Sequence, residues 1–574
     1  MRKGFGGRFM LMTLVDDLVV AALVCLIFGI GAYLSKKSSS SESFFNANHA
    51  LPWSLCVGTL MASWYNGAGI MGTVGYVCTM GFAAFFLWSI GCHAVRFPLA
   101  LWVAPRISVK AKGTIPELLR LNYGKFTSIM GAVVLVITCL SISEIACIGY
   151  IGEAGWNADK VLAAVIVVGI SIALTCLSGL MGVAITDMIF FAMMVCCVCA
   201  VFPQMFFEVG GIHGFHAALD TVDPAMMTPL GGIPVPQAII LILLCINIYK
   251  DPTFYQRFAA AKSPKTGKRA MLTCFSIFMS FDLVIMMTGI VIRVLDPSLT
   301  SQPEVEYIRQ VLMHLPVGVR GVFIVGVAGA IISTLDSYYL CGGEIIANDI
   351  IYMLRGDKRL SDRNSILVTR ISAVVFGIIG LATAFRFERV YDAFLFIASL
   401  SMTLLFVPMI AALMYDGRKT NVAGLASMIV GAASWIFFGY FLPIDIDGYV
   451  IDPVLIGLPL SLIAFVIGNR FGVDLTEKRK EDLLAKGTPA EEMVNEDRTL
   501  SEEYKKEIRI EWFGMDGALV LLYILLGCFY GYGIINQVEW IIGYGAPVIA
   551  IGIVIGVFAK YLTEVASVMN GKNR

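Results

Sequence analysis

Long apolar runs separated by short polar segments dominate this chain. A helix needs about 20 mostly apolar residues to cross a bilayer, and fifteen runs reach or approach that length. They centre near residues 15–34, 51–79, 82–104, 126–152, 159–178, 183–207, 236–256, 271–294, 317–351, 365–385, 390–415, 421–442, 453–469, 515–534 and 541–562. The pattern predicts an all-α integral membrane protein with fifteen spans.

The loops between these runs alternate in charge, which gives an orientation. The basic loops carry Lys36 and Lys37; Arg106, Lys110, Lys112 and Arg120; Arg257, Lys262, Lys265, Lys268 and Arg269; Arg355, Lys358, Arg359 and Arg363; and Arg418 and Lys419. Intervening loops such as 208–235 and 443–452 are acidic or nearly uncharged. Because Lys and Arg accumulate in cytoplasmic loops, we predict a multi-pass protein of the cell membrane with its N-terminus outside and its C-terminus in the cytoplasm. The basic tail before residue 10 opposes this orientation, and the five internal loops outweigh it.

Composition narrows the class of function. The 574 residues are 58% hydrophobic and 15% charged, and 42 basic residues balance 42 acidic ones, so no net field would recruit nucleic acid. The charge-dense segment 470–512 is too short for a nucleotide-binding domain, and the chain has no Walker or Rossmann motif. The pairs Cys196/Cys199 and His213/His216 lack further ligands for a transition metal. We therefore expect neither an enzyme nor an organic cofactor.

Span 51–79 is unusual for a lipid-facing helix because it contains a glycine-rich stretch. Residues 60–75 read LMASWYNGAGIMGTVG. An unwound stretch here would free backbone carbonyl groups to bind a cation, as broken transporter helices do. Close packing through small residues is the alternative, and the sequence leaves both interpretations open.

Span 317–351 carries hydroxyl groups on one helical stripe. The stripe comprises Ala330, Ser333, Thr334 and Ser337, at positions i, i+3, i+4 and i+7. Hydroxyl and carbonyl oxygens suit a monovalent cation that must also be released. Such hydroxyls can instead bond to their own helix, but Asp336 on an adjoining face and Glu344 further along the stripe favour a functional interpretation.

Other ionisable residues fall inside predicted spans, where they are costly and indicate function or internal pairing. Asp187 lies near the cytoplasmic end of span 183–207 and either faces the interior or sits at the interface. The remaining residues are His93, Arg96, Glu144, Asp282 and Asp392. The sequence alone does not choose among them.

Four segments resemble the sodium:solute symporter family. They are SESFFNANHALPW (41–53), GTIPELLRLNYG (113–124), SGLMGVAITD (178–187) and KDPTFYQRFAAAKS (250–263). The last two are similar to the family's glycine-leucine to threonine-aspartate signature, with Ser178 in place of its first glycine, and to the end of its seventh helix. The resemblance covers roughly residues 10–470 and implies a sodium-coupled transporter of a small polar organic solute.

The resemblance implies a LeuT-like core of two inverted five-helix repeats, preceded by one extra helix and followed by about four. The expected divisions are 1–49 for the N-terminal helix and following loop, 50–207 and 208–415 for the repeats, 416–469 for two accessory helices, 470–512 for a charged cytoplasmic linker and 513–574 for two further helices. Spans 51–79 and 317–351 then correspond to core helices one and eight.

The resemblance also implies binding residues. Backbone carbonyls of Ala62, Tyr65 and Ala330 and the hydroxyls of Ser333 and Thr334 would hold sodium. A second cation or coupling role would fall to Asp187, Asp336 and Ser337. Candidate solute-binding residues are Trp64, Asn66, Gly67, Asn247 and Tyr249. Asp336 stands where two-sodium members tend to have serine. The resemblance therefore leaves open whether one sodium ion, two sodium ions or a proton is coupled to the solute.

The expected partners are a small-molecule solute, sodium and the lipid bilayer, with no nucleic acid and no obligate protein partner. Two other classes remain as alternatives: a cation channel, which would need a continuous pore, and a membrane sensor built on a transporter core. A sodium-driven transport assay separates both from a symporter.

Overall fold

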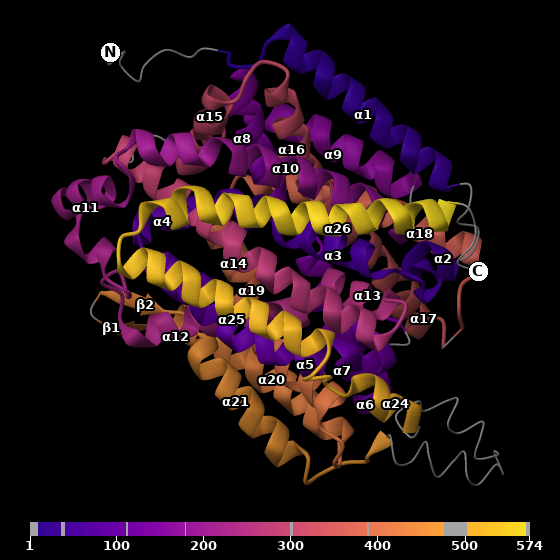
Figure 1. Ribbon diagram of the computed structural model, residues 1–574. Helices are drawn as coiled ribbons and strands as arrows, with labels where there is room; N and C mark the ends of the chain where they lie inside the picture. Colours follow the sequence, from indigo (N-terminus) through magenta and orange to yellow (C-terminus); the bar gives the residue numbers. More distant parts are fainter. Residues whose placement is uncertain are drawn as a thin grey trace.

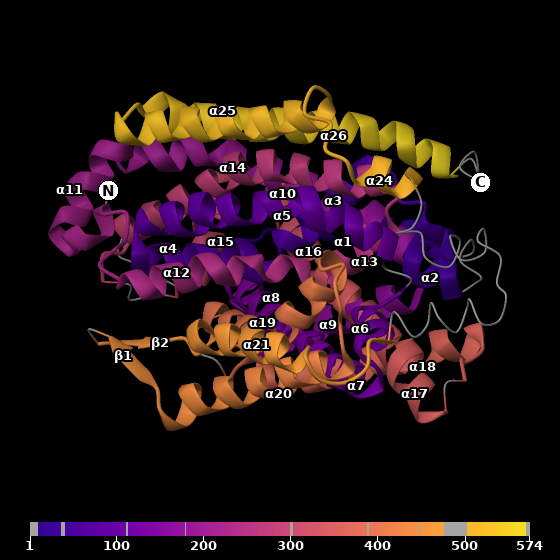
Figure 2. The same cartoon turned by 90° about the horizontal axis from the view of Figure 1, so that it is seen from below.

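A computed structural model describes residues 10–35, 41–110, 113–177, 179–298, 302–356, 358–386, 390–446, 448–475 and 502–569. Most of these residues are helical, and the long helices lie side by side along one direction, as Figures 1 and 2 show. The first half contains α1 (Leu14–Ser35), α2 (Ser41–Asn46), η1 (Ala47–His49), α3 (Trp53–Trp64), η2 (Ala68–Gly72), α4 (Thr73–Met80), η3 (Phe85–Gly91), α5 (Cys92–Lys110), α6 (Ile115–Tyr123), α7 (Lys125–Thr138), α8 (Ile142–Trp156), α9 (Lys160–Leu177) and α10 (Leu180–Glu208).

The second half is also mainly helical. It contains α11 (Gly211–Val222), η4 (Pro224–Met227), α12 (Val235–Leu244), η5 (Cys245–Tyr249), α13 (Pro252–Ala260), α14 (Pro264–Leu295), α15 (Pro303–His314), α16 (Val319–Glu344), η6 (Ile345–Ile350), α17 (Ile351–Leu354), α18 (Asp362–Ala384) and α19 (Val390–Met414). The C-terminal part contains α20 (Asn421–Ile436), η7 (Phe437–Phe441), β1 (Ile444–Ile446), β2 (Tyr449–Ile451), α21 (Val454–Gly468), α24 (Glu502–Ile508), α25 (Met515–Ile535), η9 (Ile541–Gly545) and α26 (Ala546–Met569). The two strands form one short antiparallel hairpin.

Each of the fifteen predicted runs lies on helical segments of this structure. Ten described helices are long and apolar enough to cross a membrane, or twelve if two bent pairs count as one span each. Shorter apolar helices cover the remaining runs at Ala68–Met80, Lys160–Cys176 and Val454–Gly468. The chain is an all-α membrane protein, and the crossing of all fifteen segments stays a prediction.

Burial separates a central helix from peripheral ones. Every residue in the most apolar stretch of α14 is buried, whereas only 17% of the corresponding stretches of α1 and α25 are buried. The exposed residues of α1 and α25 include many large apolar side chains, which suit contact with lipid rather than water. The core therefore lies around α14, and α1 and α25 lie at its edge.

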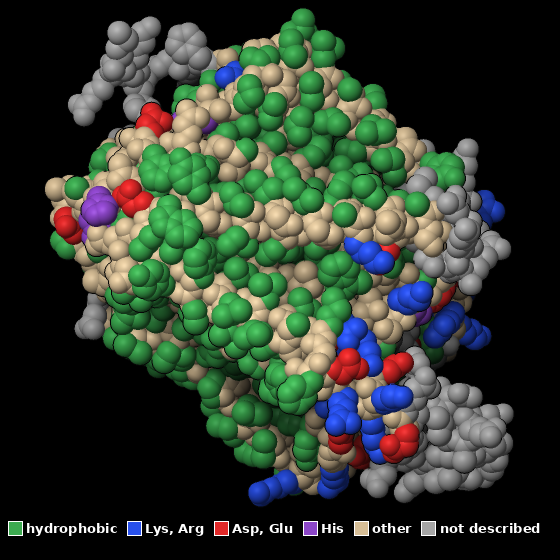
Figure 3. All heavy atoms as spheres, viewed as in Figure 1, with side chains coloured by type: hydrophobic (Ala, Val, Ile, Leu, Met, Phe, Trp, Pro, Cys, Tyr) green, Lys and Arg blue, Asp and Glu red, His purple; other side chains and the backbone are tan. Residues whose placement is uncertain are grey.

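On the face that Figure 3 shows, charged side chains gather toward the two ends of the molecule, and the surface between them is mainly apolar. Lys and Arg side chains cluster at the end that holds α24, while the loops around α11 and the β1–β2 hairpin lie at the other end (Figures 1 and 3). This separation follows the alternation of basic and acidic loops along the chain.

Two residues that the charge pattern assigned to a basic loop are buried inside the protein. Arg257 lies in α13 and Lys268 lies in α14, each fully buried. Lys268 Nζ lies 2.5 Å from a carboxylate oxygen of Asp516. The assignment to a loop was wrong because a charge count does not distinguish a solvated lysine or arginine from one that has a buried partner at a helix end.

Candidate functional site

The glycine-rich stretch at residues 60–75 forms a break between α3 and η2. Tyr65, at the end of α3, leaves the helical conformation with φ −87° and ψ 51°. A Cβ at Gly69 would lie 1.9 Å from the Trp64 carbonyl oxygen, and one at Gly67 would lie 2.5 Å from Cys147 Cβ. A larger residue would clash at both positions, with the Trp64 backbone at Gly69 and with α8 at Gly67. The span is therefore broken at Tyr65, and its glycines also allow close packing, so both interpretations of the sequence apply.

The break faces the hydroxyl stripe of α16. Thr334 Oγ1 lies 2.9 Å from the Ala330 carbonyl oxygen and 3.4 Å from the Ala62 carbonyl oxygen. Ser333 is 2% exposed, and its hydroxyl has no hydrogen-bond partner among the described residues. Carbonyl and hydroxyl oxygens of α3 and α16 thus converge in a buried place.

Asp187 of α10 lies in a buried polar cluster beside this convergence. Its Oδ2 accepts a hydrogen bond of 2.5 Å from Thr59, and its Oδ1 has no hydrogen-bond partner among the described residues. The guanidinium of Arg257 donates to the hydroxyls of Thr59 at 2.7 Å and Ser337 at 2.6 Å, and lies 3.8 Å from Asp187 Oδ2. Ser337 in turn donates to the Ser333 carbonyl oxygen at 2.7 Å. A buried charge pair therefore connects α10, α13 and α16.

Asp336 does not join that cluster through hydrogen bonds. Its Oδ1 accepts hydrogen bonds from Ser171 at 2.5 Å and Thr175 at 3.0 Å, both on α9. Ser337 lies one turn beyond Ser333 and shares its face, whereas Asp336 is only two positions from Thr334 and points elsewhere. Of the three residues predicted to act together, the structure connects Asp187 with Ser337 and directs Asp336 to α9.

A second break, between η5 and α13, lies opposite the first across a small cavity. The cavity has a volume of about 40 Å³. Its lining comprises Ser63, Trp64, Asn66, Ala68, Gly69, Trp88, Leu244, Cys245, Asn247, Ile248, Asp251, Phe254, Tyr338 and Phe394. Ser63 Oγ and Asn247 Oδ1 have no hydrogen-bond partner among the described residues. The cavity therefore offers free polar atoms between aromatic rings.

Three of the five predicted solute-binding residues line this cavity, namely Trp64, Asn66 and Asn247. The other two do not belong to its lining. The Gly67 N–H donates to a Glu144 oxygen at 2.7 Å, and the Tyr249 hydroxyl donates to the Arg96 carbonyl oxygen at 2.8 Å. Both are buried by helix packing rather than directed into the cavity.

Sequence reasoning missed Ser63, Asp251 and Tyr338 as cavity residues. One signal was present, because an aspartate before a proline typically caps a new helix. Asp251 Oδ1 accepts hydrogen bonds from the backbone N–H groups of Thr253 at 2.9 Å and Phe254 at 3.3 Å. Its Oδ2 accepts a hydrogen bond of 2.6 Å from the Tyr338 hydroxyl.

A carboxylate also caps the first break. Glu144 of α8 is 2% exposed. Its two carboxylate oxygens accept hydrogen bonds from the N–H groups of Gly67 at 2.7 Å and Ala68 at 3.3 Å. A negative charge at a helix N-terminus is favourable because the unpaired N–H groups there carry partial positive charge. Each broken helix therefore restarts at a carboxylate.

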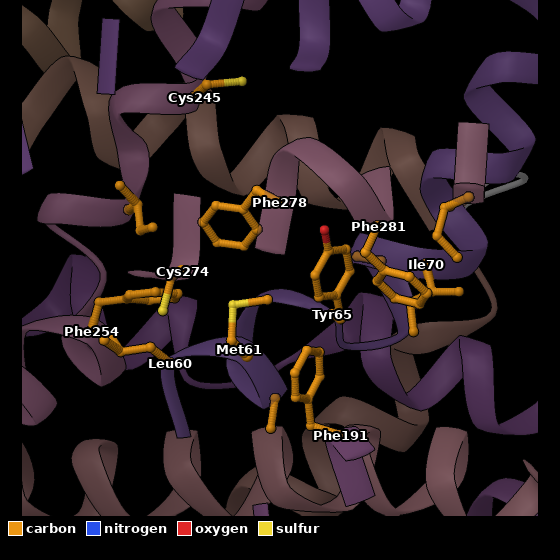
Figure 4. Close-up of a cluster of buried hydrophobic side chains, with 14 of the residues drawn as sticks. Leu60, Met61, Tyr65, Ile70, Phe191, Cys245, Phe254, Cys274, Phe278 and Phe281 are labelled. Carbon is orange, nitrogen blue, oxygen red and sulfur yellow. The ribbon is translucent and has the colours of Figure 1, made fainter. Parts of the chain in front are cut away.

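Tyr65, at the end of α3, lies in an aromatic cluster (Figure 4). Its ring stacks on that of Phe191 with centroids 6.1 Å apart and meets the ring of Phe281 edge-on at 4.8 Å. Its hydroxyl donates to Asp282 Oδ1 at 2.5 Å, and His93 Nε2 lies 2.9 Å from Asp282 Oδ2. Three residues of the polar group left unassigned by the sequence, His93, Asp282 and Glu144, thus have internal partners.

Arg96 is another buried cation near the cavity. Its guanidinium carbon lies 4.1 Å from the centroid of the Trp64 ring, so the two groups make a cation–π contact. None of its three side-chain nitrogens has a hydrogen-bond partner among the described residues. The Trp64 ring that Arg96 covers is itself part of the cavity lining.

Comparison with known proteins identifies the family of this chain. The model of the sodium:solute symporter family matches residues 44–431. The chain is 22% identical to the sodium/pantothenate symporter of Escherichia coli K12, over 80% of this chain and 97% of that protein. It is 24% identical to the osmoregulated proline transporter of Bacillus subtilis 168, over 76% of this chain and 91% of that one.

A solved structure shares the fold. It is a sodium-coupled sialic acid symporter in a substrate-bound, outward-open state, with a TM-score of 0.67 and 16% identity over 80% of this chain and 98% of that one. At this identity the likeness concerns the fold, which is the LeuT-like arrangement of inverted repeats. Helices α21 and α24 to α26 lie beyond the residues that the family model matches.

Proposed function

The chain belongs to the sodium:solute symporter family, and from this premise we propose that the α3–α16 junction binds the driving sodium ion and that the adjoining cavity binds the solute. Family membership makes the protein a multi-pass membrane transporter that couples a small solute to sodium. The proposal concerns which residues do so.

The proposed sodium ligands are the carbonyl oxygens of Ala62, Tyr65 and Ala330 and the hydroxyls of Ser333 and Thr334. The observation that carries this proposal is the unpartnered, buried hydroxyl of Ser333 beside the Thr334 hydroxyl that lies between two carbonyl groups. A buried polar atom without a partner is costly. A bound cation at this place removes that cost and ties the end of α3 to α16.

Asp187 and Ser337 are proposed to take part in coupling or in a second cation site. The free Oδ1 of Asp187 is an available ligand next to the α16 stripe. Arg257 partly balances the Asp187 charge, so one additional cation fits better than two. We assign Asp336 to the contact between α16 and α9, because it accepts hydrogen bonds from Ser171 and Thr175 of α9.

The proposed solute is small, polar and organic. Trp64, Asn66 and Asn247 offer an aromatic face and amide groups, and the unpartnered Asn247 Oδ1 and Ser63 Oγ favour a solute with hydrogen-bond donors. Asp251 adds a carboxylate to the same lining. Gly67 and Tyr249 remain proposed as contributors through the shape of the two breaks rather than by direct contact.

Cavities toward each end of the protein support transport by alternating access. One of about 190 Å³ is lined by residues such as Tyr76, Gln237 and Glu304. The other, of about 220 Å³, is lined by residues such as Glu117, Asp349 and Arg359. We propose that the basic end faces the cytoplasm, with the N-terminus outside, and that the two cavities open to the central one in turn.

Uptake by the purified protein in proteoliposomes tests the proposal. Candidate amino acids, sugars and carboxylates are offered with and without an inward sodium gradient. A membrane potential adds about 2.3 kcal/mol for each charge that crosses 100 mV. A channel would pass sodium without solute, and a sensor would accumulate neither.

The variant Ser333→Ala with Thr334→Ala tests the ion site. We expect it to lose sodium stimulation of uptake by tenfold or more while still reaching the membrane, since two of the five ligands lose their hydroxyls. The matched control is Thr403→Ala with Ser434→Ala, whose hydroxyls bond to carbonyl groups of their own helices. Unchanged sodium dependence in the first variant would reject the assignment.

A further inference from the structure

Helix α26 lies outside the family match but contacts the helices of the proposed sodium site. It runs along the surface of the core over α3, α10 and α14, and α14 lies between it and α25 (Figure 1). In its apolar stretch 44% of the residues are buried, against 17% in α25. It is therefore more deeply embedded than a peripheral lipid-facing helix.

A carboxylate of α26 caps the first turn of α3. Glu564 Oε2 accepts hydrogen bonds from the Ser54 N–H at 3.0 Å and the Ser54 hydroxyl at 2.5 Å. Ser54 is fully buried, and the Glu564 side chain is 16% exposed. The N-cap residue of α3 is Pro52, and no side chain caps from that position. The anion that the helix N-terminus favours comes from a residue 510 positions further along the chain.

One turn earlier, α26 makes a second buried hydrogen bond. The hydroxyl of Tyr561 donates to the Ile185 carbonyl oxygen of α10 at 2.9 Å, and Tyr561 is 3% exposed. Ile185 precedes Asp187 by two positions. Because residues three apart lie on one face of a helix, Tyr561 and Glu564 join α10 and α3 through the same side of α26.

The C-terminal segment that carries α26 is itself fixed to α14. Asp516, at the start of α25, pairs with Lys268 at 2.5 Å and with Arg269 at 3.0 Å. Further along α25, the Tyr530 hydroxyl donates to the Ser280 hydroxyl at 2.9 Å. Helix α25, which precedes α26 in the chain, is thus attached to the central helix α14, and α26 contacts α14 as well.

We propose that α26 belongs to the ion-coupling machinery, with Glu564 and Tyr561 as positioning residues that fix α3 relative to α10 at the sodium site. This inference rests on the proposed function. Helix α3 is about 18 Å long, at 1.5 Å per residue over 12 residues. Its first turn is held by Glu564, and its last turn carries the Ala62 carbonyl oxygen, which lies 3.4 Å from the Thr334 hydroxyl of α16. A displacement of the first turn therefore moves this carbonyl group relative to α16.

The test is a sodium titration of uptake by the full-length protein in proteoliposomes. We expect Glu564→Ala to raise the half-saturating sodium concentration roughly three- to tenfold, as the loss of a charge at a helix N-terminus would. Tyr561→Phe, which removes one hydroxyl, should raise it about threefold. The maximal rate at saturating sodium should change much less, since neither residue contacts the solute cavity.

Two controls exclude a general effect on the helix. Leu562→Ala and Thr563→Ala alter exposed neighbours on α26 and should leave the titration unchanged. A double-mutant cycle with Ser54→Ala should show that the effects of Glu564→Ala and Ser54→Ala are not additive, because both changes remove the bond between the Ser54 hydroxyl and Glu564. Ser54→Ala alone should have the smaller effect, because the backbone N–H at position 54 still donates to Glu564.

Several outcomes would overturn the proposal. One is an unaltered half-saturating sodium concentration in both Glu564→Ala and Tyr561→Phe. Another is a lower maximal rate with the half-saturating concentration retained, which indicates a structural role alone. If the unmodified protein shows no sodium stimulation, the proposed function itself fails, and this inference fails with it.

Discussion

The two broken helices of the core receive their capping carboxylates from different distances along the chain. At the α3–η2 break, the N–H groups of Gly67 and Ala68 donate to Glu144, which lies on α8, about 77 positions away. At the η5–α13 break, the N–H groups of Thr253 and Phe254 donate to Asp251, the residue that starts the new helix. The unpaired N–H groups at the first break therefore receive their carboxylate through tertiary packing, and those at the second break receive it from the local sequence.

This difference has a mechanical consequence. The second break contains its own cap, so α13 keeps its N-terminal partner wherever it moves. The first break keeps its cap only while α8 stays beside it, which couples the start of η2 to the position of α8. We expect the first break to tolerate substitution less well than the second.

The largest effect is expected at Glu144. Replacement by alanine leaves the Gly67 N–H and Ala68 N–H buried without a charged acceptor, a loss of about 1.5–3 kcal/mol for such hydrogen bonds. We expect the initial rate of sodium-driven uptake to fall roughly 10- to 100-fold, measured at equal amounts of protein in the membrane. Glu153→Gln on the same helix is the control, since Glu153 is partly exposed and pairs with Lys160. A Glu144→Ala rate within twofold of the unmodified protein would contradict the proposed role of this cap.

The effect at Asp251 is expected to be smaller. Removing an N-cap side chain costs about 1 kcal/mol, up to about 2, so Asp251→Ala should lower uptake roughly 5- to 30-fold. Asparagine caps as well as aspartate, and Asp251→Asn should restore most of the rate.

The control for Asp251 is Asp223→Ala, which removes an aspartate that caps the short helix η4 through the Ala225 N–H in an exposed loop. Uptake by that variant should stay normal. If Asp251→Asn were as damaging as Asp251→Ala, the carboxylate charge in the cavity would matter more than the cap, and the contrast with Glu144 would disappear.

The smallest effect is expected at Tyr338. Its hydroxyl donates to Asp251 Oδ2, and Tyr338→Phe removes one hydrogen bond, worth about 1 kcal/mol or about fivefold in rate. The neighbouring Tyr339 provides a matched control, because its buried hydroxyl has no hydrogen-bond partner among the described residues. Equal uptake by the two phenylalanine variants, measured side by side, would show that the Tyr338–Asp251 bond does not support the second break.

Much of the architecture could be predicted from the sequence. The apolar runs fall on helices, and the glycine-rich stretch at residues 60–75 forms a break, because these features depend on residues close together in the chain. The stripe of Ser333 and Thr334 was identified from helical spacing, and Thr334 does lie near the Ala62 carbonyl oxygen. Local periodicity was enough for each of these.

The buried polar partners could not be predicted in this way. Arg257 was assigned to a basic loop, yet it is buried between Thr59 and Ser337. Asp336 was grouped with Asp187, yet its hydrogen bonds go to α9. In both cases the residue type was informative, but its partner is supplied by a helix distant in sequence.

The sequence by itself determined that the chain forms membrane helices, where two of them are weak, and which hydroxyl groups share a face. These properties follow from hydrophobicity, glycine content and the helical repeat, which act over a few residues. Only the tertiary structure decided which carboxylate meets which helix end: Glu144 with η2, and Glu564 with α3. Burial forces each such group to find a partner, but the identity of that partner depends on how the helices pack.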